Sequence, residues 1–192
     1  MRVLFTGGGG AGTEALWNQL DGPHEVHFCD PDPRRISPVV PDHRAHRILM
    51  ADDPSYVDAI VRLCRDESID VVVPGVDEEL MPLARRRDEL SPTVVLLPDA
   101  AFVETMLDKL SFTQALAGAG IRVPRTLPLG AAGRWSAFPA IVKPRHGRGS
   151  RGVSVVDDAE ALAALRDGLA EAADTFIVQE LLHGEEYTVQ VM

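Results

Sequence analysis

The stretch Phe138-Pro-Ala-Ile-Val-Lys143-Pro-Arg-His-Gly147-Arg-Gly149-Ser-Arg-Gly152-Val153 decides the fold, because an apolar segment delivers one lysine and then enters a loop rich in glycine and arginine. Residues two apart on a strand face the same side, so Ile141 and Lys143 would share one face. Ala140 and Val142 would then face the core. Glycines let the loop present backbone amides to an anion at close range. The stretch predicts a phosphate site, with a hairpin carrying solvated arginines as the simpler alternative.

The composition is typical of a globular protein and excludes several classes of function. The 192 residues are 45% hydrophobic and 25% charged, which suits one domain or parts of two. The formal net charge of −10 argues against general nucleic-acid binding. The sequence has no run of about 18 apolar residues, and residues 1–5 lead into a glycine turn rather than a secretory signal. We therefore expect a cytoplasmic protein with neither nucleic-acid nor membrane partners.

Cysteine and histidine patterns give little support for metal binding. Cys29 and Cys64 form no CxxC motif, so buried thiols are expected rather than a disulfide or a ligand pair. The spacings His24-x-x-His27 and His43-x-x-His46 suggest a metal site, but neither has cysteines or carboxylates at a matching distance. We therefore expect no metal ligands in this chain.

The first half of the chain alternates strands and helices, which predicts a parallel sheet flanked by helices. Strands are expected at residues 2–6, 25–29, 48–51, 70–74 and 93–97, and helices at 13–20, 55–65 and 77–87. The run Gly7 to Gly12 fits the pattern G-x-G-x-x-G, and Asp30 follows the second strand where dinucleotide-binding domains place a ribose-binding acid. An NAD(P)-dependent oxidoreductase or epimerase is therefore one alternative function.

Three carboxylates, Asp77, Glu78 and Glu79, follow Pro74-Gly75 at the carboxyl end of a predicted strand. Open α/β sheets bind ligands at that edge, so these residues are candidates for substrate contact. Carboxylates in the first turn of a helix are also stabilised by the helix dipole. We favour this second interpretation and keep substrate contact as the alternative.

The pattern of the sequence changes at Leu97-Pro98-Asp99, after the alternating strands and helices, and we place a domain boundary there. A helix containing Asp108 and Lys109 follows. Lys109 lies three and seven residues from Phe112 and Leu116 and so shares their face. Its ammonium would either extend to solvent or reach a phosphate. Further on, a strand is expected at 152–156, a helix at 158–171 and a strand from 175, with a turn at 184. A last strand still running at residue 192 suggests the front part of a longer protein.

These motifs, taken in order, resemble the ATP-grasp superfamily, which includes carbamoyl-phosphate synthetase, biotin carboxylase and D-alanine ligase. The motifs are Asp108-Lys109, Gly120-Ile-Arg-Val-Pro124, the 138–153 stretch, Gln179-Glu-x-Leu182 and Gly184-Glu-Glu-Tyr-Thr-Val189. The resemblance covers nearly the whole chain and is closest to carbamoyl-phosphate synthetase large subunits and carboxylate–amine ligases. It implies an α/β fold with a Rossmann-like pre-ATP-grasp domain built on a parallel sheet, then the small α+β lid domain of an ATP-grasp fold whose C-terminal half is missing. The corresponding segments are residues 1–97 for the first domain, 98–123 for a linker helix region, and 124–192 for the lid subdomain with the first strand of the truncated C-terminal subdomain.

The resemblance also implies which residues bind ATP. The positions of Lys109 and Lys143 contact the phosphates and are implied to be catalytic, and the loop from His146 to Gly152 closes over them. Glu180 and Leu182 belong to the segment that reads adenine, and Glu186 holds the ribose hydroxyls. The full set of implied ATP-binding residues is Lys109, Ile141, Lys143, His146, Gly147, Gly149, Ser150, Gly152, Val153, Glu180, Leu182 and Glu186.

The implied reaction is ATP-dependent ligation of a carboxylate to an amine through an acylphosphate, with small-molecule substrates and a possible homodimer. ATP and Mg²⁺ are the implied cofactors, and the metal ligands of relatives lie downstream of the position of Met192. We therefore expect the 192-residue chain to bind ATP weakly at most and not to turn over. A non-catalytic regulatory protein that keeps the ATP-grasp fold is a second alternative, beside the dinucleotide-dependent oxidoreductase.

Overall fold

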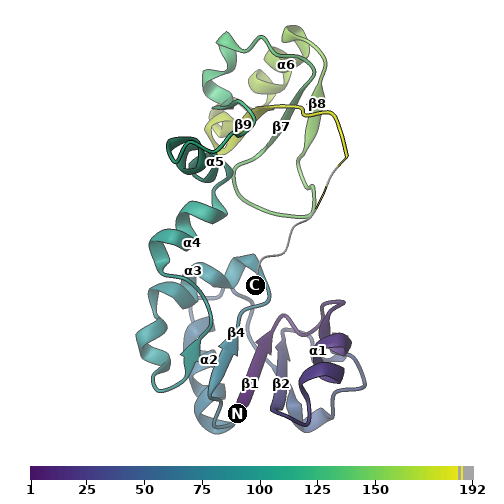
Figure 1. Cartoon of the computed structure of the whole chain (residues 1–192), viewed down its shortest axis with the longest axis vertical. Helices are drawn as coiled ribbons and strands as arrows, with labels where there is room; N and C mark the ends of the chain where they lie inside the picture. Colours follow the sequence, from purple (N-terminus) through teal and green to yellow (C-terminus); the bar gives the residue numbers. More distant parts are fainter. Residues whose placement is uncertain (186, 188–192) are drawn as a thin grey trace. The chain divides into compact units, whose positions relative to one another are not determined.

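The computed structural model describes residues 1–185 and Tyr187, and it divides into two compact units, Met1–Glu104 and Thr105–Met192 (Figure 1). Each unit has its own sheet. The division falls within helix α4 (Ala100–Leu107). The domain limits placed at residues 97 and 123 from the sequence stay a prediction.

The first unit is built on a parallel sheet whose strand order is β3-β2-β1-β4-β5. Its strands are β1 (Arg2–Thr6), β2 (Glu25–Asp30), β3 (Ala45–Arg47), β4 (Val71–Val73) and β5 (Val94–Val95). Its helices are α1 (Thr13–Leu20), α2 (Tyr56–Asp66), α3 (Asp77–Arg85) and the start of α4, with 3-10 turns at Pro33–Arg35, Asp42–Arg44 and Arg87–Leu90. The parallel α/β architecture expected from the alternation of strands and helices is confirmed.

Both faces of this sheet are covered, which explains why β2 is buried along nearly its whole length. One face packs Leu4 and Cys29 against Ile60 of α2. The opposite face packs Val26 and Phe28 in a second cluster that includes side chains of α1. As expected, Cys29 and Cys64 are buried free thiols.

The strand expected at residues 48–51 is wrong in position, because β3 spans Ala45–Arg47 instead. This strand pairs with the last three residues of β2, and Asp30 lies opposite Arg47. Since β2 ends at Asp30, β3 has no partner for further residues. Ile48 is buried in the core as its apolar character indicates, but the chain already leaves the sheet there.

The second unit contains an antiparallel sheet of order β6-β9-β7-β8, made of β6 (Thr126–Pro128), β7 (Ala140–Pro144), β8 (Ser154–Val156) and β9 (Phe176–Glu180). Its helices are α5 (Lys109–Gly118) and α6 (Ala159–Leu169), with 3-10 turns at Leu129–Arg134 and Ala170–Thr175. Ala140 and Val142 of β7 pack with Leu162 of α6 in one core. A separate antiparallel α+β unit was expected here and is confirmed.

The helices of the described residues are short. The two longest, α2 and α6, have 11 residues each. A helix that crosses a bilayer needs about 20 apolar residues. Accordingly, no helix in the described part of the chain is both long and apolar enough to span a membrane.

Candidate functional site

Strand β7 presents Lys143 on the face that does not build the core. Ala140 and Val142 are fully buried, whereas Ile141 and Lys143 are partly exposed on the other face. Ile141 lies opposite Val155 of β8, and Val155 is 55% exposed. The sequence prediction of alternating faces along this strand therefore agrees with the burial of its residues. The result is an open apolar strip with an ammonium group two residues further along.

Lys109 is the first residue of α5, and the fold brings it to the end of β7. Its backbone N–H donates to the Arg145 carbonyl at 3.0 Å, and its Nζ donates to the Gly147 carbonyl at 2.7 Å. The helix expected to contain both Asp108 and Lys109 is wrong at this point, because Asp108 is extended and lies between α4 and α5. Asp108 caps α5 by accepting from the Leu110 N–H at 3.0 Å. Lys109 is thus held beside the glycine loop by its backbone as well as its side chain.

The approach of two ammonium groups makes this region a candidate anion site. Burial lowers the pKa of Lys143, and the nearby Lys109 cation lowers it further. Across residues 1–185 and Tyr187, no carboxylate forms an ion pair with Lys143. The sequence contains two lysines in all against 17 arginines, and they are these two. A bound phosphate would relieve the repulsion between them, so the arrangement suits an anionic ligand.

The loop after β7 has the backbone of a turn that only small residues favour. Gly147, Gly149 and Gly152 have φ values of 104°, 68° and 69°, and Ser150 also has a positive φ, of 56°. His146 and Val153 lie in the same exposed loop. These residues follow the end of β7 in the chain, and their role in ATP binding stays a prediction.

Arg145, the first arginine after Lys143, is paired with a carboxylate and so adds no free positive charge to the loop. Its Nε donates to Asp108 at 3.0 Å, and its Nη2 makes a second bond to the same carboxylate. The guanidinium holds the pKa of Asp108 well below its usual range. Sequence reasoning missed this pair, although an aspartate directly before a helix is a recognisable N-cap signal.

The adenine-reading residues proposed from the resemblance lie at the end of β9. The Glu180 N–H donates to the Arg125 carbonyl at 2.9 Å, and its carboxylate accepts from the Arg125 N–H at 3.2 Å. Leu182 is 63% exposed. Glu186, the expected ribose-binding residue, lies outside the described residues. Roles in adenine and ribose recognition therefore stay predictions.

In the first unit, the three acidic candidates have different surroundings. Asp77 and Glu78 are exposed in the first turn of α3. Glu79 is 2% exposed, and its carboxylate accepts from the Gly75 and Val76 N–H groups at 2.8 and 2.9 Å. It also accepts from the Thr6 and Tyr56 hydroxyls. Because its carboxylate accepts from four donors within the first unit, Glu79 stabilises the fold. Asp77 and Glu78 stay candidates for substrate contact.

The acidic residue on which the dinucleotide alternative depends is also used within the fold. Asp30 is 6% exposed, and its carboxylate accepts from the Gly9 N–H at 2.9 Å and the Asp32 N–H at 2.9 Å. A ribose would have to compete with both bonds. The geometry therefore gives the dinucleotide alternative no support.

The residues around the two lysines do not fit a magnesium site. Mg²⁺ is usually held by carboxylates together with phosphate oxygens. Within the described part of the second unit, no cluster of three carboxylate, histidine or cysteine ligands is present. No catalytic step is therefore assigned to a metal here.

Comparisons with known proteins agree with this geometry. Residues 106–192 match the family model described as "ATP-grasp domain", and residues 11–96 match the one described as "PylC-like, N-terminal domain". A D-alanine–D-alanine ligase of Pseudomonas putida strain GB-1 is 33% identical over 92 residues, which cover 45% of this chain and 29% of the ligase. The matched part thus spans less than a third of that relative.

Solved structures show the same fold. N5-carboxyaminoimidazole ribonucleotide synthetase from Thermus thermophilus has a TM-score of 0.65 and 20% identity, over 95% of this chain and 47% of that one. L-amino acid ligase from Bacillus licheniformis has a TM-score of 0.69 and 16% identity, over 95% of this chain and 44% of that one. The chain therefore spans less than half the length of either enzyme.

Proposed function

Because the chain belongs to the ATP-grasp superfamily, we propose that its second unit is the phosphate-binding part of an ATP-dependent carboxylate–amine ligase. One observation carries the proposal, namely the approach of Lys109 and Lys143 beside the glycine loop. Phosphoryl transfer depends mainly on positioning and on neutralising charge, which two ammonium groups and loop amides supply.

In the proposed reaction, a carboxylate oxygen attacks the γ-phosphorus of ATP, the bond to the β,γ-bridging oxygen breaks, and ADP leaves. An amine then attacks the acylphosphate, so that phosphate leaves and an amide forms. Lys143 and Lys109 would hold the phosphates, and the loop from His146 to Gly152 would cover them. Ile141 and Val153 would contact the nucleotide, while Glu180 and Leu182 would read adenine.

Several finer assignments belong to the proposal and rest on the family. The substrates would be a small carboxylate and an amine, in a protein of carbamoyl-phosphate synthetase type that uses Mg²⁺, acts in the cytoplasm and can form a homodimer. Because the chain covers less than half of the solved ligases, we propose that these 192 residues alone bind ATP weakly and do not turn over.

Isothermal titration of the chain with ATP and with ADP tests the proposal. Hydrogen bonds to charged groups contribute about 1.5–3 kcal/mol, so Lys143→Ala should weaken binding by about 10- to 100-fold. Arg122→Ala removes a cation from an exposed position of the same unit and is the matched control. Equal losses in the two variants, or no binding of either nucleotide at millimolar concentration, would contradict the proposal.

The presence of two lysines in the sequence offers a direct second readout. Reductive ¹³C-methylation keeps their charge and gives one NMR signal for each lysine, which Lys109→Arg assigns. Phosphate binding favours the charged ammonium, so ADP should raise the pKa of Lys143, which is lowered in the free chain. Signals that stay unchanged at saturating ADP would place the nucleotide elsewhere.

A further inference from the structure

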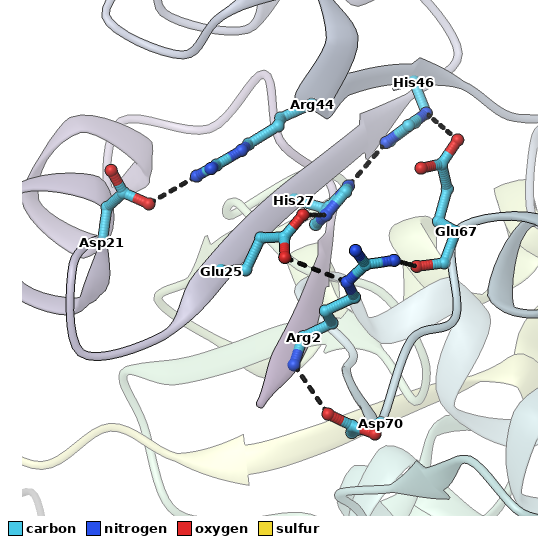
Figure 2. A network of polar contacts seen from close by, with 8 residues as sticks. All are labelled: Arg2, Asp21, Glu25, His27, Arg44, His46, Glu67 and Asp70. Carbon is cyan, nitrogen blue, oxygen red and sulfur yellow. Dashed lines mark hydrogen bonds and ion pairs between the residues drawn. The ribbon is translucent and has the colours of Figure 1, made fainter.

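A second group of polar residues lies in the first unit, on the face of the sheet that α2 covers (Figure 2). His27 of β2 is 2% exposed, and His46 of β3 has a side chain that is 14% exposed. Their rings stack with centroids 5.2 Å apart, and His27 Nδ1 lies 2.9 Å from His46 Nε2. Two imidazoles therefore meet at hydrogen-bond distance in a largely buried place.

The strand register explains why these two histidines meet. In the parallel pair of β2 and β3, His46 lies opposite Cys29, so His27 is its diagonal neighbour on the same face. His24 and His43 are not part of this cluster. Each spacing noted in the sequence thus contributes one histidine, and the sequence analysis, which considered each spacing separately, did not identify this pair.

A carboxylate completes the cluster. Glu67 follows the last residue of α2, and its Oε1 lies 4.0 Å from His46 Nδ1, too far for a hydrogen bond. One ligand atom each from His27, His46 and Glu67 can be chosen so that all three lie within 4.8 Å of one another. The Glu67 side chain is 35% exposed and can rotate toward the histidines.

The nearby arginines are paired with other carboxylates, so the charge around the cluster does not oppose binding of a cation. Arg2 is matched by Glu25 at 2.9 Å, and Arg44 is matched by Asp21 at 2.6 Å. Arg2 Nη1 also donates to the backbone carbonyl of Glu67 at 2.7 Å, while the Glu67 carboxylate lies 4.0 Å from His46 Nδ1. The carboxyl end of α2 adds the negative end of a helix dipole, which also favours a positive charge.

Glu25 occupies the position of an outer-shell partner. Its Oε1 lies 3.4 Å from His27 Nε2, so this nitrogen can donate to Glu25 while Nδ1 faces the cluster. A carboxylate on the far nitrogen of a ligating histidine is the usual arrangement in metal sites. Burial lowers the pKa values of both histidines, and the neutral imidazole is the form that binds a metal.

We propose that His27, His46 and Glu67 form a binding site for one divalent transition metal ion of the zinc class. Two imidazoles and one carboxylate are a known protein ligand set for Zn²⁺, with water in the fourth position. On binding, the proton between the two rings would move from His46 Nε2 to His46 Nδ1, so that both rings stay neutral, and Glu67 would close the remaining distance. The ligands come from β2, β3 and the end of α2, so the ion would stabilise the first unit independently of the nucleotide site in the second.

The cluster lies close to the surface of the first unit. An open cavity of about 610 Å³ is lined by Arg2, Glu25 and Arg44, which border the histidines. Figure 2 shows these side chains around His27. The side chains of His46 and Glu67 are themselves 14% and 35% exposed, so part of the cluster is in contact with solvent.

Calorimetric titration of the metal-free 192-residue chain with Zn²⁺ tests this site. We expect one ion per chain in the wild type. His46→Gln and Glu67→Gln should each weaken binding by at least about 10-fold, and Glu25→Gln, which removes an outer-shell partner, by about 10- to 100-fold. His43→Gln, an exposed histidine three residues from His46, is the control and should bind Zn²⁺ like the wild type.

The variants also guard against loss of folding. Trp17 fluorescence in a Trp135→Phe background without metal shows whether the first unit of each variant is folded. If His46→Gln is not folded, the result for Glu67→Gln decides between the outcomes. Absence of stoichiometric Zn²⁺ binding by the wild type would overturn the proposal. So would equal affinities of the Glu67→Gln and His43→Gln variants.

Discussion

Asp108 is the residue on which the placement of both lysines depends. Its carboxylate accepts from the Leu110 N–H and the Ser111 hydroxyl, at 3.0 and 2.8 Å, which starts α5 at Lys109. The same carboxylate holds Arg145, two residues after Lys143. One side chain thus joins the start of α5 to the end of β7.

Asp108→Asn isolates the ion pair, because asparagine caps a helix about as well as aspartate does. We expect the second unit to lose about 1–3 kcal/mol of stability at pH 7, since Arg145 loses its charged partner. Urea unfolding followed by Trp135 fluorescence in a Trp17→Phe background measures this. The difference in stability between the wild type and Asp108→Asn should become smaller at acidic pH. The pKa of Asp108 is lowered in the folded chain, so its contribution is complete above the unfolded pKa of about 3.9 and declines as the pH falls below it.

A matched control is available in the same unit. Asp158 is exposed and caps α6, because its carboxylate accepts from the Ala161 N–H at a distance of 2.8 Å. Asp158→Asn should change stability by no more than about 0.5 kcal/mol. Equal effects of the two substitutions would show that Arg145 contributes nothing beyond the cap.

At the scale of elements, the glycine loop offers two positions with nearly the same φ and different surroundings. Gly149 and Gly152 have φ values of 68° and 69°. A Cβ at Gly152 would meet Pro144 Cγ at 3.1 Å, whereas a Cβ at Gly149 would have no neighbour within 4 Å. The end of the loop is therefore packed on β7, and its middle is open.

Alanine at these two positions separates backbone strain from packing. A left-handed alanine costs about 1–2 kcal/mol, and Gly149→Ala should cost no more than this. Gly152→Ala should cost about 1 kcal/mol more, because Pro144 has to move. Urea unfolding of the Trp17→Phe background measures both variants, and a Gly152→Ala variant as stable as Gly149→Ala would refute the packing argument.

At the scale of the whole molecule, each unit has its own core and its own proposed ligand. The sequence has two tryptophans, Trp17 in the first unit and Trp135 in the second. Trp17→Phe leaves a probe of the second unit alone, and Trp135→Phe leaves a probe of the first.

We expect each ligand to stabilise one unit. At 100 times its dissociation constant, a ligand adds about 2.7 kcal/mol to the stability of the state it binds. ADP should raise the unfolding midpoint reported by Trp135, and Zn²⁺ the one reported by Trp17. The midpoint of unfolding is measured for each of the two variants with and without each of the two ligands, which gives four comparisons. A common midpoint that both ligands move would contradict two independent units.

Much of the architecture could be predicted from local pattern. The alternation along Ala140-Ile-Val-Lys143 indicated which side chains are buried, and the run around Gly7 to Gly12 indicated a strand, a turn and a helix. The shift of β3 to Ala45–Arg47 was not predictable in this way, because its limits follow from the end of β2.

The sequence by itself determined the order of strands and helices, the faces of the strands and the glycine loop, because hydrophobic period and backbone preference act within a few residues. The tertiary structure alone decided that Lys109 meets the end of β7, that Arg145 pairs with Asp108, and that His27 meets His46. These partners are 36, 37 and 19 residues apart. Such contacts depend on strand register and on where a helix begins, and these are set by packing between elements rather than by local pattern.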